Sequence, residues 1–270
     1  MIAEFTIGFR EALEAALVVG IILGYLKKTN QTEHNNRVYV GIAAGVLASI
    51  ATAFAFNSLA IQFEGAAEQI FEGATMILAA VLLTWMIFWM SKQKQLALNI
   101  QKAVDKSVAG GLTALAFVAV YREGFETVLF LNALAFSQQT DPLLGAFLGT
   151  FAAVLLGILI YEIEIRLDLK ALFRITSFML ILFSAGLVSH GIHEFQEAGV
   201  IPFFLQEAWN TQNILDDHSA AGSVFRGLFG YNDNPSVLEV LAYAFYLTVM
   251  LYAIEIVAET KLSRKKELNF

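Results

Sequence analysis

Two five-residue strings combine carboxylates and an arginine at the same spacing, far apart in an otherwise apolar chain. They read Arg-Glu-Ala-Leu-Glu from Arg10 and Arg-Glu-Gly-Phe-Glu from Arg122. On a helix, residues three or four apart share a face, so each string can present two carboxylates with an arginine beside them. Carboxylate oxygens suit hard, multiply charged cations, such as iron and other divalent or trivalent metals. The carboxylates predicted to form one cation site are Glu11, Glu14, Glu123 and Glu126.

Both strings lie within apolar stretches long enough to cross a bilayer. A charge at the centre of a membrane helix costs about 2.5–3.5 kcal/mol on insertion scales, and ionisable residues at such positions usually serve function. Four carboxylates against two guanidinium groups leave a negative excess that a metal ion would neutralise. Arg10 and Arg122 are expected to keep the carboxylates ionised and oriented while no ion is bound. The alternative is a structural ion-pair network that locks two helices together.

The composition is typical of a polytopic membrane protein. Of 270 residues, 57% are hydrophobic and 15% are charged, and the mean hydropathy is +0.64. Soluble domains carry about 25% charged residues. The absence of cysteine excludes thiolate metal sites and disulfides, and a net charge of −7 argues against a nucleic-acid partner. We therefore expect an all-α fold in a lipid bilayer.

Seven apolar stretches approach or exceed the roughly 20 residues that a spanning helix needs. They lie near residues 2–26, 38–60, 70–90, 109–136, 143–165, 174–195 and 236–258. The first lacks a basic leading segment and is interrupted by charges such as Glu4 and Arg10, so we interpret it as a span of the mature protein and not as a signal peptide. The sequence thus predicts a single integral membrane domain over residues 1–270, with seven transmembrane helices.

The distribution of lysine and arginine predicts the orientation, because these residues concentrate on cytoplasmic loops. They gather after the first, third and fifth spans and in the tail 259–270. The residues concerned are Lys27, Lys28, Arg37, Lys92, Lys94, Lys102, Lys106, Arg166, Lys170, Arg174, Lys261, Arg264, Lys265 and Lys266. The pattern places the C-terminus in the cytoplasm, the N-terminus outside, and the long loop 196–235 outside.

The duplicated string also predicts an internal repeat. The strings lie in the first and fourth spans, an offset of three spans, and three is odd, so the helices that carry them run in opposite directions through the membrane. Residues 1–90 and 109–195 would then form a 3+3 inverted repeat, with the span 236–258 added. Transporters built this way hold their substrate near the midplane, where the repeats meet.

A second group of candidate ligands lies toward the outer side. Glu64, Glu68 and Glu72 follow the spacing of one helical face as they lead into the third span. They could form a vestibule that attracts cations, or they could be a solvated helix start favoured by the helix dipole. Further candidates at the outer end of the sixth span and in the long loop are His190, His193, Glu194, Glu197 and His218, with Asp216 and Asp217 beside the last.

The chain resembles the oxidase-dependent iron transporter family, which includes the fungal high-affinity iron permeases and a bacterial ferrous iron permease. The resemblance rests on the two R-E-x-x-E strings and covers nearly the whole chain. Supporting segments are Phe71-Glu72-Gly73, Leu83-Thr84-Trp85-Met86, Glu197-Ala198-Gly199, Phe229-Gly230-Tyr231 and Pro235-Ser236-Val237. One departure is visible: bacterial relatives tend to read His-Glu-Ala-Gly after the sixth span, whereas Gln196 stands here, and His193-Glu194 could substitute.

The resemblance implies a permease that takes iron across the cytoplasmic (inner) membrane, often beside an extracytoplasmic oxidase or iron-binding partner. Iron would be the substrate, and no cofactor would be bound permanently. The motif carboxylates would handle iron, with Glu72 and Glu68 as further metal-binding candidates. The alternatives are a permease for manganese or lead, a structural membrane subunit of an oxidase complex, and a membrane-embedded metal-dependent enzyme.

Overall fold

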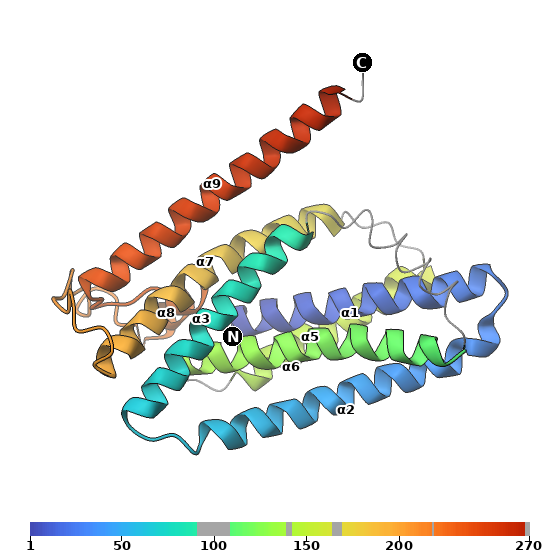
Figure 1. Ribbon diagram of the computed structural model, residues 1–270, viewed down its shortest axis with the longest axis horizontal. Coiled ribbons are helices and arrows are strands. Elements are labelled where there is room, and N and C mark those ends of the chain that lie inside the picture. The colour runs from blue at the N-terminus through green and yellow to red at the C-terminus, as the bar shows by residue number, and fades with distance from the viewer. Residues whose placement is uncertain (91–108, 139–141, 164–168, 218, 268–270) are drawn as a thin grey trace.

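The computed structural model describes residues 1–90, 109–138, 142–163, 169–217 and 219–267. Within these ranges all regular secondary structure is helical, with eight α-helices and no strand. The long helices are α1 (Ile2–Lys28), α2 (Asn35–Ala60), α3 (Ala66–Met90), α5 (Ala109–Gln138), α6 (Leu143–Ile163), α7 (Leu169–Glu197) and α9 (Val237–Glu267). The all-α prediction is confirmed for this part of the chain (Figure 1).

Five of the long helices, α2, α3, α6, α7 and α9, are long and apolar enough to cross a membrane. Their lipid-compatible faces are evident in the side chains left exposed, for example Phe54 of α2, Phe147 of α6 and Phe245 of α9, each about 70% exposed. The remaining two, α1 and α5, are as long but carry the charged strings at their middle. The chain is a multi-pass membrane protein.

One further helix, α8 (Ala220–Phe229), lies inside the segment predicted as an outer loop, 196–235. Its N-terminus is capped by Ser219, whose Oγ accepts a hydrogen bond from the Gly222 N–H at 3.0 Å. Its C-terminus ends at Gly230 in the left-handed region, at φ 66°. The two caps explain why ten residues suffice for a helix here, although the segment contains no spanning-length apolar stretch.

The helices pack as close pairs, α1 with α6 and α2 with α5, while α3 packs on α7 and α9 on α7. Glycines allow the close approach: a Cβ at Gly149 of α6 would overlap the Phe5 carbonyl oxygen of α1, and a Cβ at Gly41 of α2 would overlap the Thr113 carbonyl oxygen of α5. Backbones that meet at small residues are the usual packing of membrane helices. α1 and α5 run in opposite directions where they cross (Figure 1).

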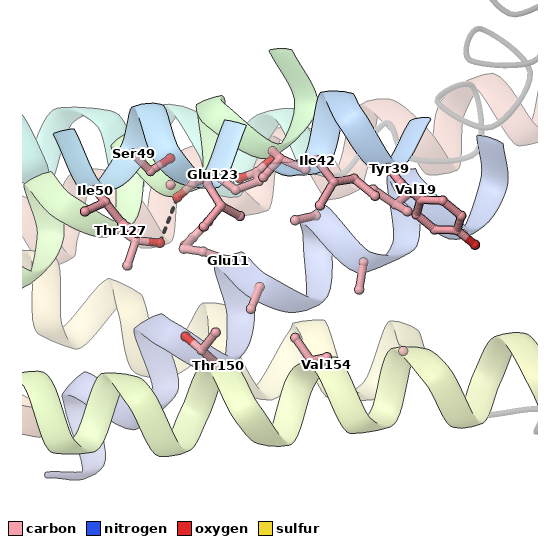
Figure 2. A pocket seen from close by; sticks show the side chains of 18 of the residues that line it. Glu11, Val19, Tyr39, Ile42, Ser49, Ile50, Glu123, Thr127, Thr150 and Val154 are labelled. Atoms are coloured by element: carbon pink, nitrogen blue, oxygen red, sulfur yellow. Dashed lines mark hydrogen bonds between the residues drawn. The ribbon is translucent and has the colours of Figure 1, made fainter. Parts of the chain in front are cut away.

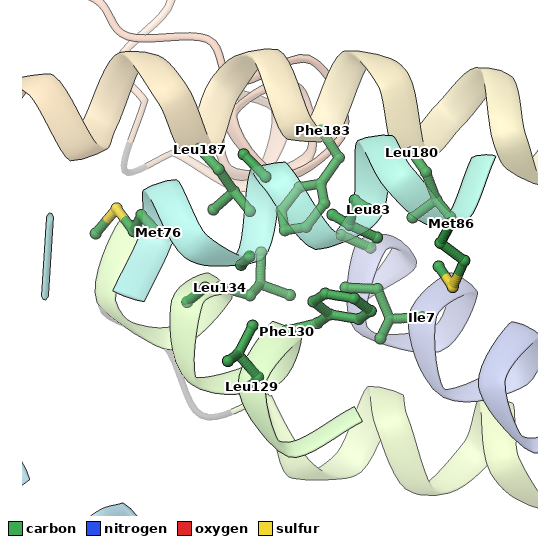
Figure 3. Close-up of a cluster of buried hydrophobic side chains, with 14 of the residues drawn as sticks. Ile7, Met76, Leu83, Met86, Leu129, Phe130, Leu134, Leu180, Phe183 and Leu187 are labelled. Atoms are coloured by element: carbon green, nitrogen blue, oxygen red, sulfur yellow. The ribbon is translucent and has the colours of Figure 1, made fainter. Parts of the chain in front are cut away.

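A buried apolar cluster lies on one side of the crossing between α1 and α5. It joins Ile7 of α1, Leu83 of α3, Phe130 of α5 and Phe183 of α7, each at most 5% exposed (Figure 3). Contacts among four helices fix the angle and register at which α1 meets α5. This cluster therefore positions the charged strings, which lie one to two turns from its members.

Replacing Gly149 by alanine is expected to destabilise the protein. The added methyl group would overlap the Phe5 carbonyl oxygen and lie 2.8 Å from the Phe9 nitrogen, so α1 and α6 would have to separate. Overpacking of this kind costs about 1–3 kcal/mol. Gly24→Ala is the matched control, because nothing lies within 4 Å of a Cβ at Gly24. Equal melting temperatures of the two purified variants would contradict this packing.

Candidate metal centre

Three carboxylates from the two charged strings meet where α1 crosses α5. Ligand oxygens of Glu11, Glu123 and Glu126 all lie within 4.8 Å of one another. Glu11 and Glu123 are nearly inaccessible, and the Glu126 side chain is 14% exposed. Figure 2 shows Glu11 and Glu123 side by side. Ionised carboxylates this close repel one another, and a cation between them would relieve the repulsion, so the arrangement suits a hard metal ion.

Arg10 ties the two carboxylates of its own string together. Its Nη1 donates to Glu11 Oε1 at 2.7 Å, and its Nη2 lies 2.8 Å from Glu14 Oε1. The guanidinium group is fully buried, and Nη1 also lies 2.9 Å from Met86 Sδ of α3. Arg10 therefore neutralises Glu14 and holds one oxygen of Glu11, while the other oxygen of Glu11 remains available.

Arg122 makes the corresponding contacts in a different environment. Its Nε donates to Glu123 Oε1 at 3.0 Å, its Nη2 also pairs with that oxygen, and its Nε lies 3.8 Å from Glu126 Oε1. The Arg122 side chain is 42% exposed, whereas Arg10 is fully buried. The arginine of the first string is therefore buried, whereas the arginine of the second string is partly exposed.

Two buried oxygens complete the description of the centre. Glu11 Oε2 and Glu123 Oε2 have no hydrogen-bond partner among the described residues. A buried acceptor left without a partner costs about 1–3 kcal/mol, and more when it is charged. A cation between these two oxygens would remove that cost, because it would coordinate both.

A cavity of about 620 Å³ opens beside Glu11 and Glu123. Most of its lining is apolar and comes from α1, α2, α5 and α6, with hydroxyl groups from Ser49, Thr127 and Thr150 (Figure 2). Because a water molecule takes roughly 30 Å³, the space can hold a partly hydrated ion next to the two carboxylates.

Glu14 lies beside the close group of three carboxylates and stays a predicted ligand. The spacing placed Glu14 in the same ligand set as the other three carboxylates, but only Glu11, Glu123 and Glu126 form the close group. Glu14 Oε1 lies 2.8 Å from Arg10 Nη2, and the Glu14 charge still acts on Glu11 and Glu126. Glu14 thus lies in the ion-pair network beside the cluster.

The structure brings some of the predicted outer candidates together and leaves others apart. Glu72 and Glu68 of α3 lie near Glu194 and Glu197 of α7, close enough for their charges to interact. The close contact between α3 and α7 brings them together, since a Cβ at Gly73 would lie 3.2 Å from the Glu194 Cβ. Glu64 is exposed and outside this group, and His218 lies outside the described residues.

The histidines of α7 have different surroundings. His190 is buried; its Nδ1 lies 3.0 Å from the Gly186 carbonyl oxygen, and its Nε2 has no hydrogen-bond partner among the described residues. His193 is half-buried and lies between two carboxylates, with Nδ1 3.0 Å from Glu239 Oε1 and Nε2 3.2 Å from Glu197 Oε1. The three-residue spacing places both on one side of α7.

Comparison with known proteins decides the family. A model of the iron permease FTR1 family matches residues 1–262. The chain belongs to this family. The ferrous iron permease EfeU of Escherichia coli O6:K15:H31 (strain 536 / UPEC) is 37% identical over 262 residues, which cover 94% of this chain and 95% of the relative. EfeU of Yersinia pestis is 36% identical over 256 residues, covering 92% and 90%. No solved structure matches the chain significantly.

Membership of the iron permease family confirms the resemblance seen in the sequence. The family's members are permeases, so the chain is a transporter and not an enzyme. The alternative of a membrane-embedded metal-dependent enzyme is therefore wrong.

No role was predicted from the sequence for Glu239, a buried carboxylate of this iron permease family member. It is fully buried at the start of α9; Oε1 accepts from the Ser236 N–H at 3.0 Å and Oε2 accepts from Asn232 Nδ2 at 3.0 Å. The signal in the sequence is Ser236-Val-Leu-Glu239, the spacing of a helix capping box. Gln196, the departure noted above, accepts from Ser236 Oγ at 2.7 Å and so joins α7 to this cap.

A second acidic group lies in the segment after α7. Oxygens of Asp216, Asp217 and Asp233 lie within 4.8 Å of one another. Arg226 Nη1 donates to Asp217 at 2.9 Å, and Arg226 Nε donates to the Ser137 carbonyl oxygen at 2.9 Å. These contacts attach the segment to the end of α5, which is a structural use of the aspartates.

Proposed function

We propose that the protein is an iron permease that moves iron across the cytoplasmic membrane into the cell through the carboxylates of its two R-E-x-x-E strings. The observation that carries the proposal is the close group of Glu11, Glu123 and Glu126 in a member of the iron permease family. Two of these carboxylates have buried oxygens available to an ion. Iron is the cargo in this proposal, and no cofactor is bound permanently.

The proposed topology has seven spans within one domain, residues 1–270. The long helices α1, α2, α3, α5, α6, α7 and α9 correspond in order to the seven apolar stretches of the sequence. α1 and α5 count as spans because their central charges are paired within each string, and all of them except Arg122 and Glu126 are buried. The lysine and arginine distribution then places the N-terminus outside and the C-terminus in the cytoplasm.

Matched helix contacts support the proposed inverted repeat. The difference in residue number between Arg10 and Arg122 is the same as that between Glu4 and Ala116 and between Phe5 and Phe117. Each of these four residues approaches a glycine of the neighbouring helix at a corresponding place. The matched pairs are Glu4 with Gly145 and Ala116 with Gly41, then Phe5 with Gly149 and Phe117 with Gly45.

The same offset relates two pairs of stacked aromatic rings. Phe5 and Phe9 stack with ring centroids 5.9 Å apart, and Phe117 and Tyr121 stack with centroids 5.5 Å apart, both at an interplanar angle of 9°. The packing of α1 on α6 is thus repeated by α5 on α2, as an inverted repeat of residues 1–90 and 109–195 requires.

The proposed transport cycle follows from this arrangement. Outer acidic groups, including Glu68 and Glu72, collect the ion, and the central carboxylates bind it after partial dehydration. Movement of one repeat against the other then exposes the ion to the cytoplasm. The unequal environments of Arg10 and Arg122 support two alternating states, because related residues of an inverted repeat exchange environments when access alternates.

The proposal is tested by uptake of radiolabelled ferrous iron into liposomes that contain only this purified protein. We expect time-dependent uptake that unlabelled iron suppresses more strongly than manganese or lead does. The relatives' description as ferrous iron permeases supports this choice of ion. Stronger suppression by manganese or lead would assign the permease to that metal. Absence of both uptake and metal binding would favour a structural subunit that acts beside an extracytoplasmic oxidase or iron-binding partner.

A further inference from the structure

The outer ends of α3 and α7 and the start of α9 bring a histidine and several carboxylates together. His193 lies at the centre of this group, which we name the outer cluster: Glu68, Glu72, His193, Glu194, Glu197 and Glu239. The outer cluster is separate from the central carboxylates, which belong to α1 and α5. It combines an imidazole with carboxylates, whereas the central group has carboxylates alone.

We propose that the outer cluster is a second metal site, in which His193 Nε2 and the Glu197 carboxylate bind a divalent cation and Glu239 orients the histidine. The role of this site as a relay for iron rests on the proposed function. Its ability to bind a divalent cation stands on the geometry of His193 and its two partners.

The His193 ring is held in one orientation by Glu239. His193 Nδ1 lies 3.0 Å from Oε1 of the fully buried Glu239, which the Ser236 N–H and Asn232 hold in place. A histidine that ligates a metal commonly donates its other N–H to a carboxylate, which fixes the tautomer and aims the free nitrogen. With the proton on Nδ1, the lone pair of Nε2 faces the exposed side of the cluster.

The distance between His193 Nε2 and the Glu197 carboxylate fits two ligands of one metal ion. His193 Nε2 and Glu197 Oε1 are 3.2 Å apart. Two adjacent ligands at about 2.0–2.2 Å from one metal ion are separated by roughly 3 Å in octahedral geometry and roughly 3.4 Å in tetrahedral geometry. Without a metal, a proton on Nε2 can join the two groups. A metal ion would replace that proton, which would leave for solvent, with no large movement of either side chain.

The surroundings of His193 and Glu197 carry an excess of negative charge. Glu72 is half-buried and lies within range of the charges of Glu68, Glu194 and Glu197, and among the described residues no arginine or lysine is a main contributor to the charge acting on it. Gln69 Nε2 donates to Glu197 Oε2 at 3.0 Å and so fixes this carboxylate. Excess negative charge at a partly exposed site attracts cations and raises their local concentration.

The test is pulsed electron paramagnetic resonance of Mn²⁺ bound to the purified full-length protein in lipid nanodiscs. A coordinated imidazole gives ¹⁴N modulation, which carboxylate ligands do not give. We expect the modulation in the wild-type protein, its loss in His193→Gln, and its retention in His34→Gln, a histidine remote from the cluster. Glu239→Gln is expected to weaken Mn²⁺ binding about 10- to 100-fold. Glu197→Gln, at a side chain that is 50% exposed, weakens binding without threatening the fold.

The outcomes separate this site from the central one. We expect Glu11→Gln to retain the ¹⁴N modulation even though it removes a central carboxylate. Absence of modulation in the wild-type protein, or its persistence in His193→Gln, would overturn the outer site. Normal iron uptake by Glu11→Gln would instead count against the central site and leave the assignment of His193 intact.

Discussion

Replacing Glu11 or Glu123 by glutamine is expected to lower the initial rate of iron uptake about 10- to 100-fold, the range found when groups that support metal binding are lost. Each carboxylate contributes a buried oxygen without a hydrogen-bond partner among the described residues. Glutamine keeps the shape but removes the negative charge that balances the cation. The measurement is the uptake rate per mole of reconstituted protein, in liposomes matched for protein content.

Three further variants make this result specific. Glu33→Gln, at a side chain that is 79% exposed outside the cluster, is expected to transport normally. Glu126→Gln is expected to transport less than Glu14→Gln, because Glu126 belongs to the close group whereas Glu14 is held by Arg10. Normal uptake by both Glu14→Gln and Glu126→Gln would contradict the assignment of these carboxylates.

Arg10→Met is expected to cause the largest loss of stability. The change leaves Glu11 and Glu14 buried without the cation that now lies 2.7 and 2.8 Å from their oxygens. Breaking a buried pair by removing one partner costs about 3–5 kcal/mol. The measurement is the midpoint temperature at which the purified protein unfolds, together with the yield of monodisperse protein.

Arg122→Met is the matched comparison, because it removes the same group from the other string. The Arg122 side chain is 42% exposed and its Nε lies 3.8 Å from Glu126, against 2.8 Å between Arg10 and Glu14, so the shift in midpoint temperature should be smaller. Adding Glu14→Gln to Arg10→Met should recover part of the loss, since one uncompensated charge disappears. Equal losses at the two arginines, or no recovery in the double variant, would contradict the described roles.

The sequence predicted that carboxylates of the two strings would lie close together, because charged residues are rare within spanning stretches. Helical spacing alone placed the two carboxylates of each string on one face. It could not predict that Glu14 would lie outside the closest group or that Arg10 and Arg122 would differ in exposure, because both strings share the R-E-x-x-E pattern. Those differences arise from the helices that surround each string, such as α3, whose Met86 contacts Arg10.

The outer cluster shows a different limit of sequence reasoning. His193, Glu194 and Glu197 are close in the chain, so their proximity was predictable. The contact with Glu72 depends on the packing of α3 on α7 at Gly73, and the contact with Glu239 depends on the position of α9. Glu239 was recognisable as part of a capping box, but the spacing of a cap does not indicate that a histidine from another helix will bond to it.

A structure of the protein in lipid after incubation with ferrous iron under anaerobic conditions tests the central claim most directly. We expect anomalous scattering from iron between α1 and α5, with Glu11 Oε2 and Glu123 Oε2 at metal-ligand distances and Glu126 beside them. Iron bound elsewhere, with Glu11 and Glu123 unchanged and no density between them, would contradict it.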